Sequence, residues 1–295
     1  RLVTWGAIVN AVITTVAAHY LTGLSWSLSA LFGAIMVVTG PTVIAPMLRT
    51  VRPNIQIART LRWEGIVIDP LGALFAVLVF EWIVAQQGSP ELSPVLLAFA
   101  RTLLTGLGLG VLGGYLYGLL LRHRQIPPFL QNFSAIAVVT AIFALADMLM
   151  HESGLLAVTV MGIWLANMPG VHTRDILNFK ESLTLILVSS LFIILSSRID
   201  FSSVATLGWS ALGVLLVMQF VARPAKIFLA TIGSPMKRNE RLALAWIGPR
   251  GIVAAAISAV FALKLEFLNY ENAELLVPLA FSVIIGTVVI QSASA

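Results

Sequence analysis

The chain of 295 residues is strongly apolar, with 59% hydrophobic residues, 11% charged residues and a mean hydropathy of +0.97. These values exclude an ordinary soluble domain and indicate a polytopic membrane protein, and the absence of cysteine excludes disulfides, thiol catalysis and cysteine-bound metals. The net charge of +5 does not indicate nucleic-acid binding, because the basic residues fall in short connections between apolar runs. A lipid bilayer is therefore the expected surrounding.

The apolar runs predict about ten membrane spans, each close to the 20 residues that a bilayer requires. Divided at polar, Pro and Gly clusters, the spans cover about 4–21, 26–49, 59–86, 95–121, 131–149, 153–168, 177–196, 204–232, 241–264 and 273–291. We therefore expect an all-α membrane protein. Because the sequence starts inside an apolar run without an initiator Met, we interpret it as part of a longer protein.

Basic residues are distributed unevenly between the two sets of connections that alternating spans create. One set holds clusters rich in Lys and Arg at 49–62, 122–124 and 237–241, and the other set holds very few. Lys and Arg concentrate on the cytoplasmic side of membrane proteins. The pattern predicts that both visible ends lie in the cytoplasm, and we expect a multi-pass protein of the cell's inner (plasma) membrane.

Helix-breaking residues interrupt two of the predicted spans at similar depth. The interruptions are Thr39-Gly40-Pro41-Thr42 and Gly248-Pro249-Arg250-Gly251. Each lies about eight residues, or roughly 12 Å, from the cytoplasmic end of its span. Either they only kink the helices, or they expose backbone groups that line a transport site, which paired interruptions in two halves of a chain indicate. Ionisable residues in neighbouring spans favour the transport site.

Asp69 and Glu64 lie in the same apolar span, 59–86. Asp69 is about 15 Å into the bilayer and too short to reach water. A carboxylate at that depth is either neutralised by a proton or paired with a cation. A proton-coupled cation carrier requires an acid poised between those two states, whereas a permanent pairing with a structural base would be the alternative.

Glu64 points about 140° away from Asp69 around the helix, so we expect it to have a separate partner. Arg223, in the cytoplasmic third of 204–232, fits by depth and charge, and a bridge between them would hold two helices together. Lys226 is expected to extend towards cytoplasmic water. Arg250 either does the same or places a fixed positive charge beside the interruption.

Familiar enzyme motifs are absent from the sequence. It contains no Walker A loop, nucleophile elbow or HExxH motif, so we expect no ATP-driven pump, no enzyme and no cofactor. An intramembrane aspartyl hydrolase using Asp69 and Asp147 is disfavoured, because these residues lie near opposite bilayer depths and a dyad requires contact.

Several segments together carry a family resemblance that extends, in order, across essentially the whole chain. They are "TGPTVIAP", "WEGIVIDPLGAL", "HESGLLAVTVMGIWLAN", "SLFIILSSRIDF", "ARP" and "WIGPRGIVAAAIS". Their combination resembles the NhaP-type sodium/proton exchangers of the monovalent cation:proton antiporter family. The resemblance implies an antiporter fold of two inverted repeats with crossing broken helices, of which residues 1–295 would form the last ten helices.

The same resemblance implies an organisation and a function. Helices at about 4–86 and 204–291 would form a transport core that moves against dimer-side helices at about 95–196. The protein would be a homodimer that exchanges Na⁺ or K⁺ for a proton and serves pH homeostasis. A cation channel or a transport-inactive sensor with the same fold is the alternative.

Carried over residue by residue, the resemblance assigns roles to the residues already singled out. Asp69 corresponds to the shared cation and proton site, and Thr39 to the threonine whose main-chain carbonyl helps to bind the ion. Glu64 corresponds to a structural glutamate with Arg223 as its partner. Arg250 corresponds to the arginine of the family's Gly-x-Arg-Gly motif.

Three positions depart from the family pattern. Gly40 stands where the family usually has aspartate, Ile68 where it has asparagine, and Gly65 where serine can occur. Each departure removes an oxygen ligand, so K⁺ becomes a candidate beside Na⁺. With one carboxylate at the presumed centre, the simplest expectation is electroneutral exchange of one cation for one proton.

Overall fold

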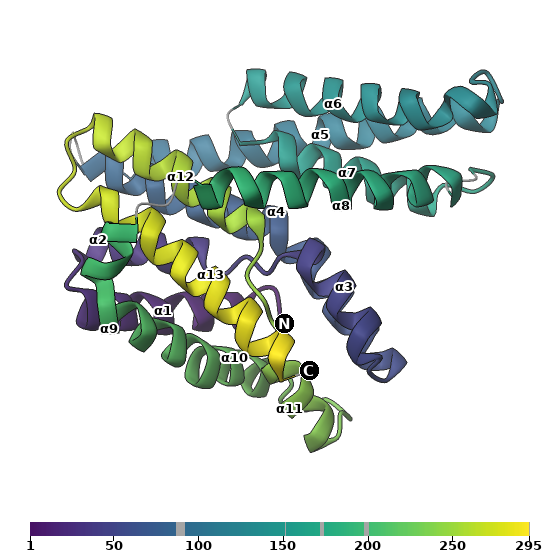
Figure 1. Ribbon diagram of the computed structural model, residues 1–295. Helices are drawn as coiled ribbons and strands as arrows, with labels where there is room; N and C mark the ends of the chain where they lie inside the picture. The colour runs from purple at the N-terminus through teal and green to yellow at the C-terminus, as the bar shows by residue number, and fades with distance from the viewer. Residues whose placement is uncertain (87–91, 151, 172–173, 198–200, 295) are drawn as a thin grey trace. The chain divides into compact units, whose positions relative to one another are not determined.

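The structure is a computed structural model that describes residues 1–295 except 87–91, 151, 172–173, 198–200 and 295 (Figure 1). The described residues form α-helices joined by short turns and contain no β-strand. The α-helices are α1 (Trp5–Thr22), α2 (Trp26–Ile35), α3 (Pro41–Val51), α4 (Ile55–Gln86), α5 (Leu92–Arg122), α6 (Gln131–Leu149), α7 (Gly154–Asn167), α8 (Arg174–Ser197), α9 (Phe201–Val217), α10 (Arg223–Ala230), α11 (Arg238–Trp246), α12 (Ile252–Phe267) and α13 (Leu276–Ala293). The short elements are the 3₁₀ turns η1 (Pro128–Leu130) and η3 (Ala273–Leu275) and the π-helical turn η2 (Met218–Ala222). The predicted all-α class is confirmed.

The helices group into the predicted spans once interrupted helices are joined. Helices α2 and α3 together cover 26–49, α11 and α12 cover 241–264, and α9 continues through η2 into α10. Among the described residues, five helical segments are by themselves long and apolar enough to cross a membrane: Ile55–Ala85, Leu96–Arg122, Pro128–Leu149, Leu207–Ala230 and Ala273–Ala293. The protein is therefore a multi-pass membrane protein.

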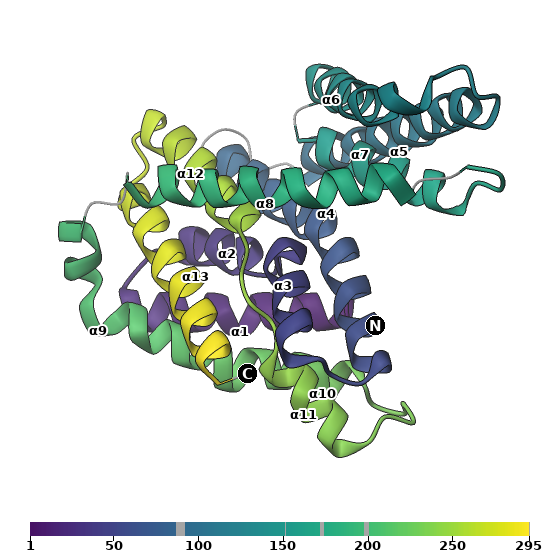
Figure 2. The same cartoon turned by 45° about the vertical axis from the view of Figure 1, so that its right-hand side comes forward.

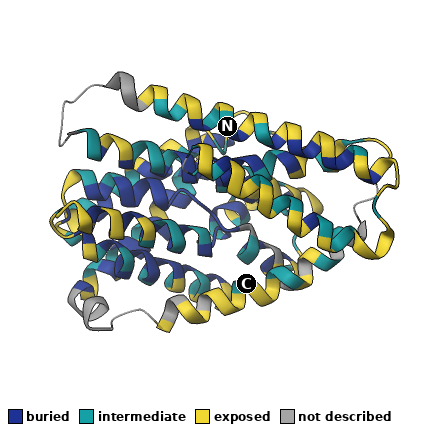
Figure 3. Ribbon diagram, turned by 90° about the horizontal axis from the view of Figure 1, so that it is seen from above, coloured by how far each residue is buried: buried dark blue, intermediate teal, exposed yellow. Residues whose placement is uncertain are grey.

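The chain forms two compact units, Arg1–Ile83 with Leu191–Ala295, and Val84–Ser190. In the first unit, α1 packs against α2, α9 and α10, and α13 packs against α2, α9 and α12 (Figures 1 and 2). Phe32 and Ile35 of α2 and Leu279 and Ile284 of α13 are fully buried. Figure 3 shows buried residues in dark blue and exposed residues in yellow along the helices.

A separate apolar cluster joins four helices of the first unit at the end predicted to face the cytoplasm. Ile44 of α3, Leu61 of α4, Ile227 of α10 and Leu244 of α11 pack together in it. Side chains from segments far apart in sequence thereby fix the first turns of α4. This packing places Glu64, three residues beyond Leu61, opposite α10.

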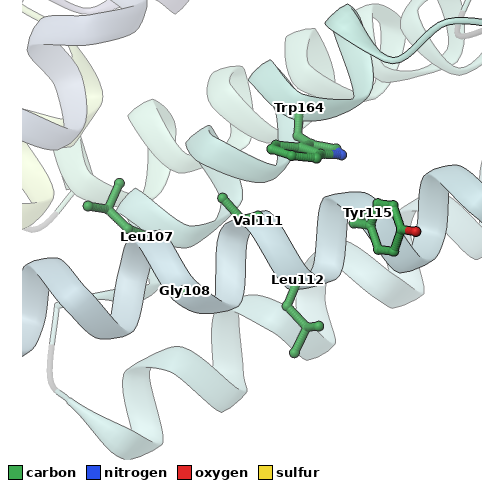
Figure 4. A pocket seen from close by; sticks show the side chains of 6 residues that line it. All are labelled: Leu107, Gly108, Val111, Leu112, Tyr115 and Trp164. Carbon is green, nitrogen blue, oxygen red and sulfur yellow. The ribbon is translucent and has the colours of Figure 1, made fainter.

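The second unit is built on α5, which packs against α6 and α7. Gly110 and Gly114 lie so close to α7 that a Cβ atom at either position would overlap it, which is how small residues allow membrane helices to approach. An open groove on this unit is lined by Leu107, Gly108, Val111, Leu112, Tyr115 and Trp164 (Figure 4). No charged side chain lines it, so it is not a candidate ion site.

Candidate functional site

The first interrupted helix unwinds between Ile35, the last residue of α2, and Pro41, the first of α3. The N–H groups of Val37 and Val38 bond three residues back, to Ala34 and Ile35, so the helix tightens before it ends. Unwinding therefore starts three residues before the predicted Thr39. The second interruption spans 247–251, between α11 and α12.

The two unwound segments cross at a pair of glycines. The N–H of Gly40 donates to the carbonyl of Pro249 over 3.3 Å. A Cβ atom on Gly40 would lie 2.5 Å from the Cα of Gly251, a distance that real Cβ atoms do not show. The φ angle of Gly40 is −73°, which suits any residue, so space and not conformation requires glycine here.

Two polar side chains reach the second interruption, Gln219 from the π-helical turn η2 and Arg223 from the residue that directly follows it. Gln219 donates from Nε2 to the carbonyl of Trp246 over 3.0 Å, and Arg223 donates from Nη2 to the carbonyl of Ile247 over 2.7 Å. These carbonyls lie at the C-terminal end of α11, where no following turn of helix supplies N–H donors for them. A π-helical turn inside an α-helix frequently marks a functional site, and here it positions both donors.

Helix α13 completes the second interruption from another side. Gln291 accepts at Oε1 from the N–H of Gly248 over 3.1 Å, and Thr287 accepts from the N–H of Arg250 over 3.4 Å. Gln291 also donates from Nε2 to Gln219 Oε1 over 2.8 Å. The unwound backbone is thus bonded to protein at membrane depth, as an apolar surrounding requires.

The carbonyls of the first interruption are bonded by Asn10 of α1 and by Arg250. Asn10 donates from Nδ2 to Met36 over 3.1 Å, and Arg250 donates from Nη1 to Val37 and Val38 over 3.4 and 3.5 Å. Arg250 also donates from Nη2 to Asn10 Oδ1 over 3.2 Å and is only 2% exposed. Arg250 therefore does not reach the cytoplasm. Sequence reasoning missed Asn10, although an amide within an apolar span is a recognisable signal.

Glu64 is enclosed by two cations. Arg223 donates from Nη1 and Nη2 to its two carboxylate oxygens over 2.5 and 3.0 Å, and Lys226 donates to Oε1 over 2.6 Å. The expectation that Lys226 extends to water was wrong, since it is 1% exposed. Lys226 lies one turn after Arg223 on the same helix face, and the missing side chain of Gly6 leaves space for its stem.

Gly248 also makes room for this ion pair. A Cβ atom at Gly248 would lie 2.5 Å from Nε of Arg223. The missing side chain of Gly248 therefore allows the guanidinium of Arg223 to reach both Ile247 and Glu64. The pair and the second interruption form one connected structure.

Asp69, in contrast, has an unbonded oxygen. Its Oδ1 is buried and has no hydrogen-bond partner among the described residues, and the same holds for Oγ1 of Thr39 and of Thr42. Gly72, one turn beyond Asp69, lies against Val38, so this part of α4 packs directly on the first interruption. Thr42 was not singled out as a site residue from the sequence, although it is the last residue of the predicted interruption.

Ile68 lies in an apolar cluster. It is fully buried and packs against Ala11 of α1 and Val37 of the first interruption. It thus contributes an apolar wall at a position where the resemblance found in the sequence leads us to expect asparagine. Gly65, one turn earlier, is also buried.

Comparison with known proteins identifies the family of this chain. Residues 1–295 match the family described as "Sodium/hydrogen exchanger, transmembrane". The chain belongs to this family. The resemblance found in the sequence is therefore confirmed, and it concerns transport proteins and not enzymes.

Individual sodium/hydrogen exchanger relatives agree with this assignment. The K⁺/H⁺ antiporter NhaP2 of Shewanella oneidensis is 28% identical over 298 residues, which cover 99% of this chain and 50% of that protein. The Na⁺/H⁺ antiporter 1 of Methanocaldococcus jannaschii is 27% identical over 245 residues, covering 80% of this chain and 56% of that protein. This chain spans about half the length of the curated relatives it matches.

A solved structure shows that the fold is that of an antiporter. The structure of the sodium proton antiporter MjNhaP1 from Methanocaldococcus jannaschii superimposes with a TM-score of 0.83 at 24% identity. The match covers 99% of this chain and 78% of that one. The predicted antiporter fold is confirmed.

Proposed function

We propose that this protein exchanges a monovalent cation, Na⁺ or K⁺, for a proton across the membrane, with Asp69 as the shared binding site. The observation that carries the proposal is the contrast between the two acids of α4. Glu64 accepts three hydrogen bonds from two cations, whereas Oδ1 of Asp69 is buried without a partner in the described structure. A buried carboxylate without a fixed base is free to alternate between a proton and a cation.

The chemistry of Asp69 and of the polar residues at the first interruption fits a hard monovalent cation. Asp69 supplies carboxylate oxygens, and Thr39 and Thr42 have unbonded hydroxyl oxygens. The carbonyls of Val37 and Val38 are bonded by Arg250, so the cation has few protein ligands and keeps part of its water. No cluster of three or more His, Asp or Glu side chains that could hold a metal is present in the described part of the chain.

The exchange cycle then follows from the competition at one carboxylate. Asp69 releases its proton, binds the cation, and the site becomes accessible from the other side before the reverse exchange occurs. Glu64, Arg223 and the crossing at Gly40, Pro41, Gly248 and Pro249 hold the site together and take no part in proton transfer. No cofactor is needed.

We extend the proposal to the organisation of the whole protein. The unit Arg1–Ile83 with Leu191–Ala295 would be the transport core, and Val84–Ser190 would be the dimer side of a homodimer. Both visible ends would face the cytoplasm across the inner membrane, because Lys and Arg gather in the connections on that side. The cellular role would be pH homeostasis.

Replacing Asp69 tests the proposal directly. The full-length protein is reconstituted in liposomes, and proton movement is recorded after Na⁺ or K⁺ is added. Asp69→Asn preserves the shape of the side chain but cannot titrate, so we expect exchange to disappear while the protein stays folded. Glu81→Gln is the matched control, because Glu81 lies on the same helix but is exposed, and it should retain exchange.

Two results would reject the proposal. Substantial cation-dependent proton flux in Asp69→Asn would show that another group carries the ions. Cation conduction by the wild type without coupled proton movement would identify a channel.

A further inference from the structure

Asn10 is a single side chain that bonds both interrupted helices. It lies in α1, which is continuous, and it is fully buried. Its Nδ2 donates to Met36 in the first interruption, and its Oδ1 accepts from Arg250 in the second. The cation-binding residues singled out from the sequence do not include it.

Asn10 and Arg250 donate hydrogen bonds to the main-chain carbonyls that follow α2. The carbonyls of Met36, Val37 and Val38 follow the last turn of α2, where the helix dipole places partial negative charge. Main-chain oxygens of this kind bind alkali cations in membrane proteins. Here the permanently charged guanidinium of Arg250 donates to the carbonyls of Val37 and Val38, and the amide of Asn10 donates to the carbonyl of Met36.

The position of Arg250 depends on Asn10. The hydrogen bonds from Arg250 Nη1 to the carbonyls are long, 3.4 and 3.5 Å, whereas the bond from Nη2 to Asn10 is 3.2 Å. Arg250 Nε has no partner among the described residues. Without the Asn10 oxygen, the guanidinium would be held only by two marginal bonds, and Met36 would lose its donor.

We propose that Asn10 is a positioning residue of the exchange site, which rests on the exchange function proposed above. Asn10 holds Arg250 on the end of α2 and holds the backbone that leads directly to Thr39. The transported cation is thereby excluded from the carbonyls after α2. It binds at Asp69, and Thr39 is held at a defined distance from it. Loss of Asn10 should therefore weaken cation binding before it slows the cycle.

The test compares variants of Asn10 in the reconstituted full-length protein. Asn10→Leu has a similar volume but removes both hydrogen bonds. We expect its apparent KM for the cation to rise about tenfold, the effect of losing a hydrogen bond to a charged group, with a maximal rate within about threefold of wild type. Asn10→Asp keeps an acceptor for Arg250, so its KM should rise clearly less than that of Asn10→Leu.

Thr14→Val is the control, because it also removes a buried polar group from α1. Thr14 lies one turn from Asn10, is fully buried, and its hydroxyl has no partner in the described structure. Its KM should equal that of wild type. Thermal unfolding in detergent is recorded for every variant, so that loss of folded protein is separated from loss of affinity.

The outcomes separate this inference from the exchange function. An unchanged KM in Asn10→Leu, with only a lower yield or maximal rate, would show that Asn10 is purely structural. Equal KM increases in Asn10→Leu and Asn10→Asp would show that the bond to Arg250 is not the one that matters. Absence of cation-dependent proton flux in the wild type would reject the exchange function itself, and this inference with it.

Discussion

The two acids of α4 differ because their neighbours differ. Glu64 faces α10, whose Arg223 and Lys226 donate three hydrogen bonds to it. Asp69 is one and a half turns further along, on the part of α4 that packs on the first interruption through Gly72, and its buried Oδ1 has no hydrogen-bond partner in the described structure. Two carboxylates on one helix therefore differ: Glu64 is fixed in an ion pair, and Asp69 keeps the unbonded oxygen that the proposed exchange requires.

The cluster of Glu64, Arg223 and Lys226 predicts an order of stability losses. Glu64→Gln leaves two buried cations without a counter-charge and should cost most, roughly 3–5 kcal/mol. Arg223→Met should cost less, since Lys226 still neutralises Glu64, and Lys226→Met should cost least because the bidentate pair remains. Thermal unfolding in detergent gives the order.

A double replacement checks that these effects arise from pairing. The double variant Glu64→Gln with Arg223→Gln should be more stable than Glu64→Gln alone, because the second substitution removes one of the two cations left without a counter-charge. Glu81→Gln, an exposed position on the same helix, provides the reference. Equal losses in all three single variants, or strictly additive losses in the double variant, would contradict the cluster.

At the scale of helices, the two interruptions are stable because intact neighbours supply the bonds that unwinding removes. Asn10 of α1, Gln219 and Arg223 near η2, and Thr287 and Gln291 of α13 provide them. An unwound segment inside a bilayer without such partners would leave costly unbonded groups. The interrupted helices thus depend on α1, η2, α10 and α13, and not on their own sequence alone.

The crossing of the interruptions predicts that Gly40 tolerates no side chain. Gly40→Ala places a Cβ atom 2.5 Å from the Cα of Gly251, so the backbone must shift. We expect a loss of about 1–3 kcal/mol from overpacking, together with strongly reduced exchange. Unfolding temperature and proton flux measure the two effects.

Gly108→Ala is the control for this prediction. It introduces the same methyl group at a position where, beyond the adjoining residues and backbone of its own helix, the described structure has no atom within 4 Å of the new Cβ. Its stability should be unchanged or slightly higher, because alanine favours the helix more than glycine does. If Gly40→Ala behaved in the same way, the close crossing would be wrong.

At the scale of the whole molecule, the charges buried near the interruptions determine the expected stoichiometry. Glu64, Arg223, Lys226 and Arg250 are bonded to one another or to the backbone, whereas Asp69 keeps an unbonded oxygen in the described structure. Ile68 and Gly40 contribute no second charge. On the proposed mechanism, one exchangeable carboxylate would bind either one proton or one cation, so each cycle would move no net charge.

We therefore predict exchange that is independent of the membrane potential and weakly selective among monovalent cations. Proton flux against Na⁺, K⁺ and Li⁺ is measured with and without an imposed potential. Few fixed ligands enforce no short distances, so small cations should gain little advantage. A rate that follows the potential, or a strong preference for Li⁺ or Na⁺ over K⁺, would show that another residue completes the site.

The sequence by itself determined the fold class, the spans and the family. Apolar runs of membrane length and the Gly-Pro interruptions are local features, because a bilayer dictates helix length and proline removes a backbone donor wherever it stands. Asp69 and Glu64 were also visible locally, since an acid in an apolar span is costly and therefore conspicuous. Prediction of the first interruption was three residues late, because helix ends depend on local turn bonds that composition does not encode.

Only the tertiary structure decided which groups meet. Asn10 and Arg250 are 240 residues apart in the sequence, and Lys226 and Glu64 are 162 apart. Neither periodicity nor spacing relates such positions, so Lys226 was expected in water and Asn10 was not considered. Whether a buried polar group is bonded or free depends on the few ångströms between side chains of different helices, and packing alone sets those distances.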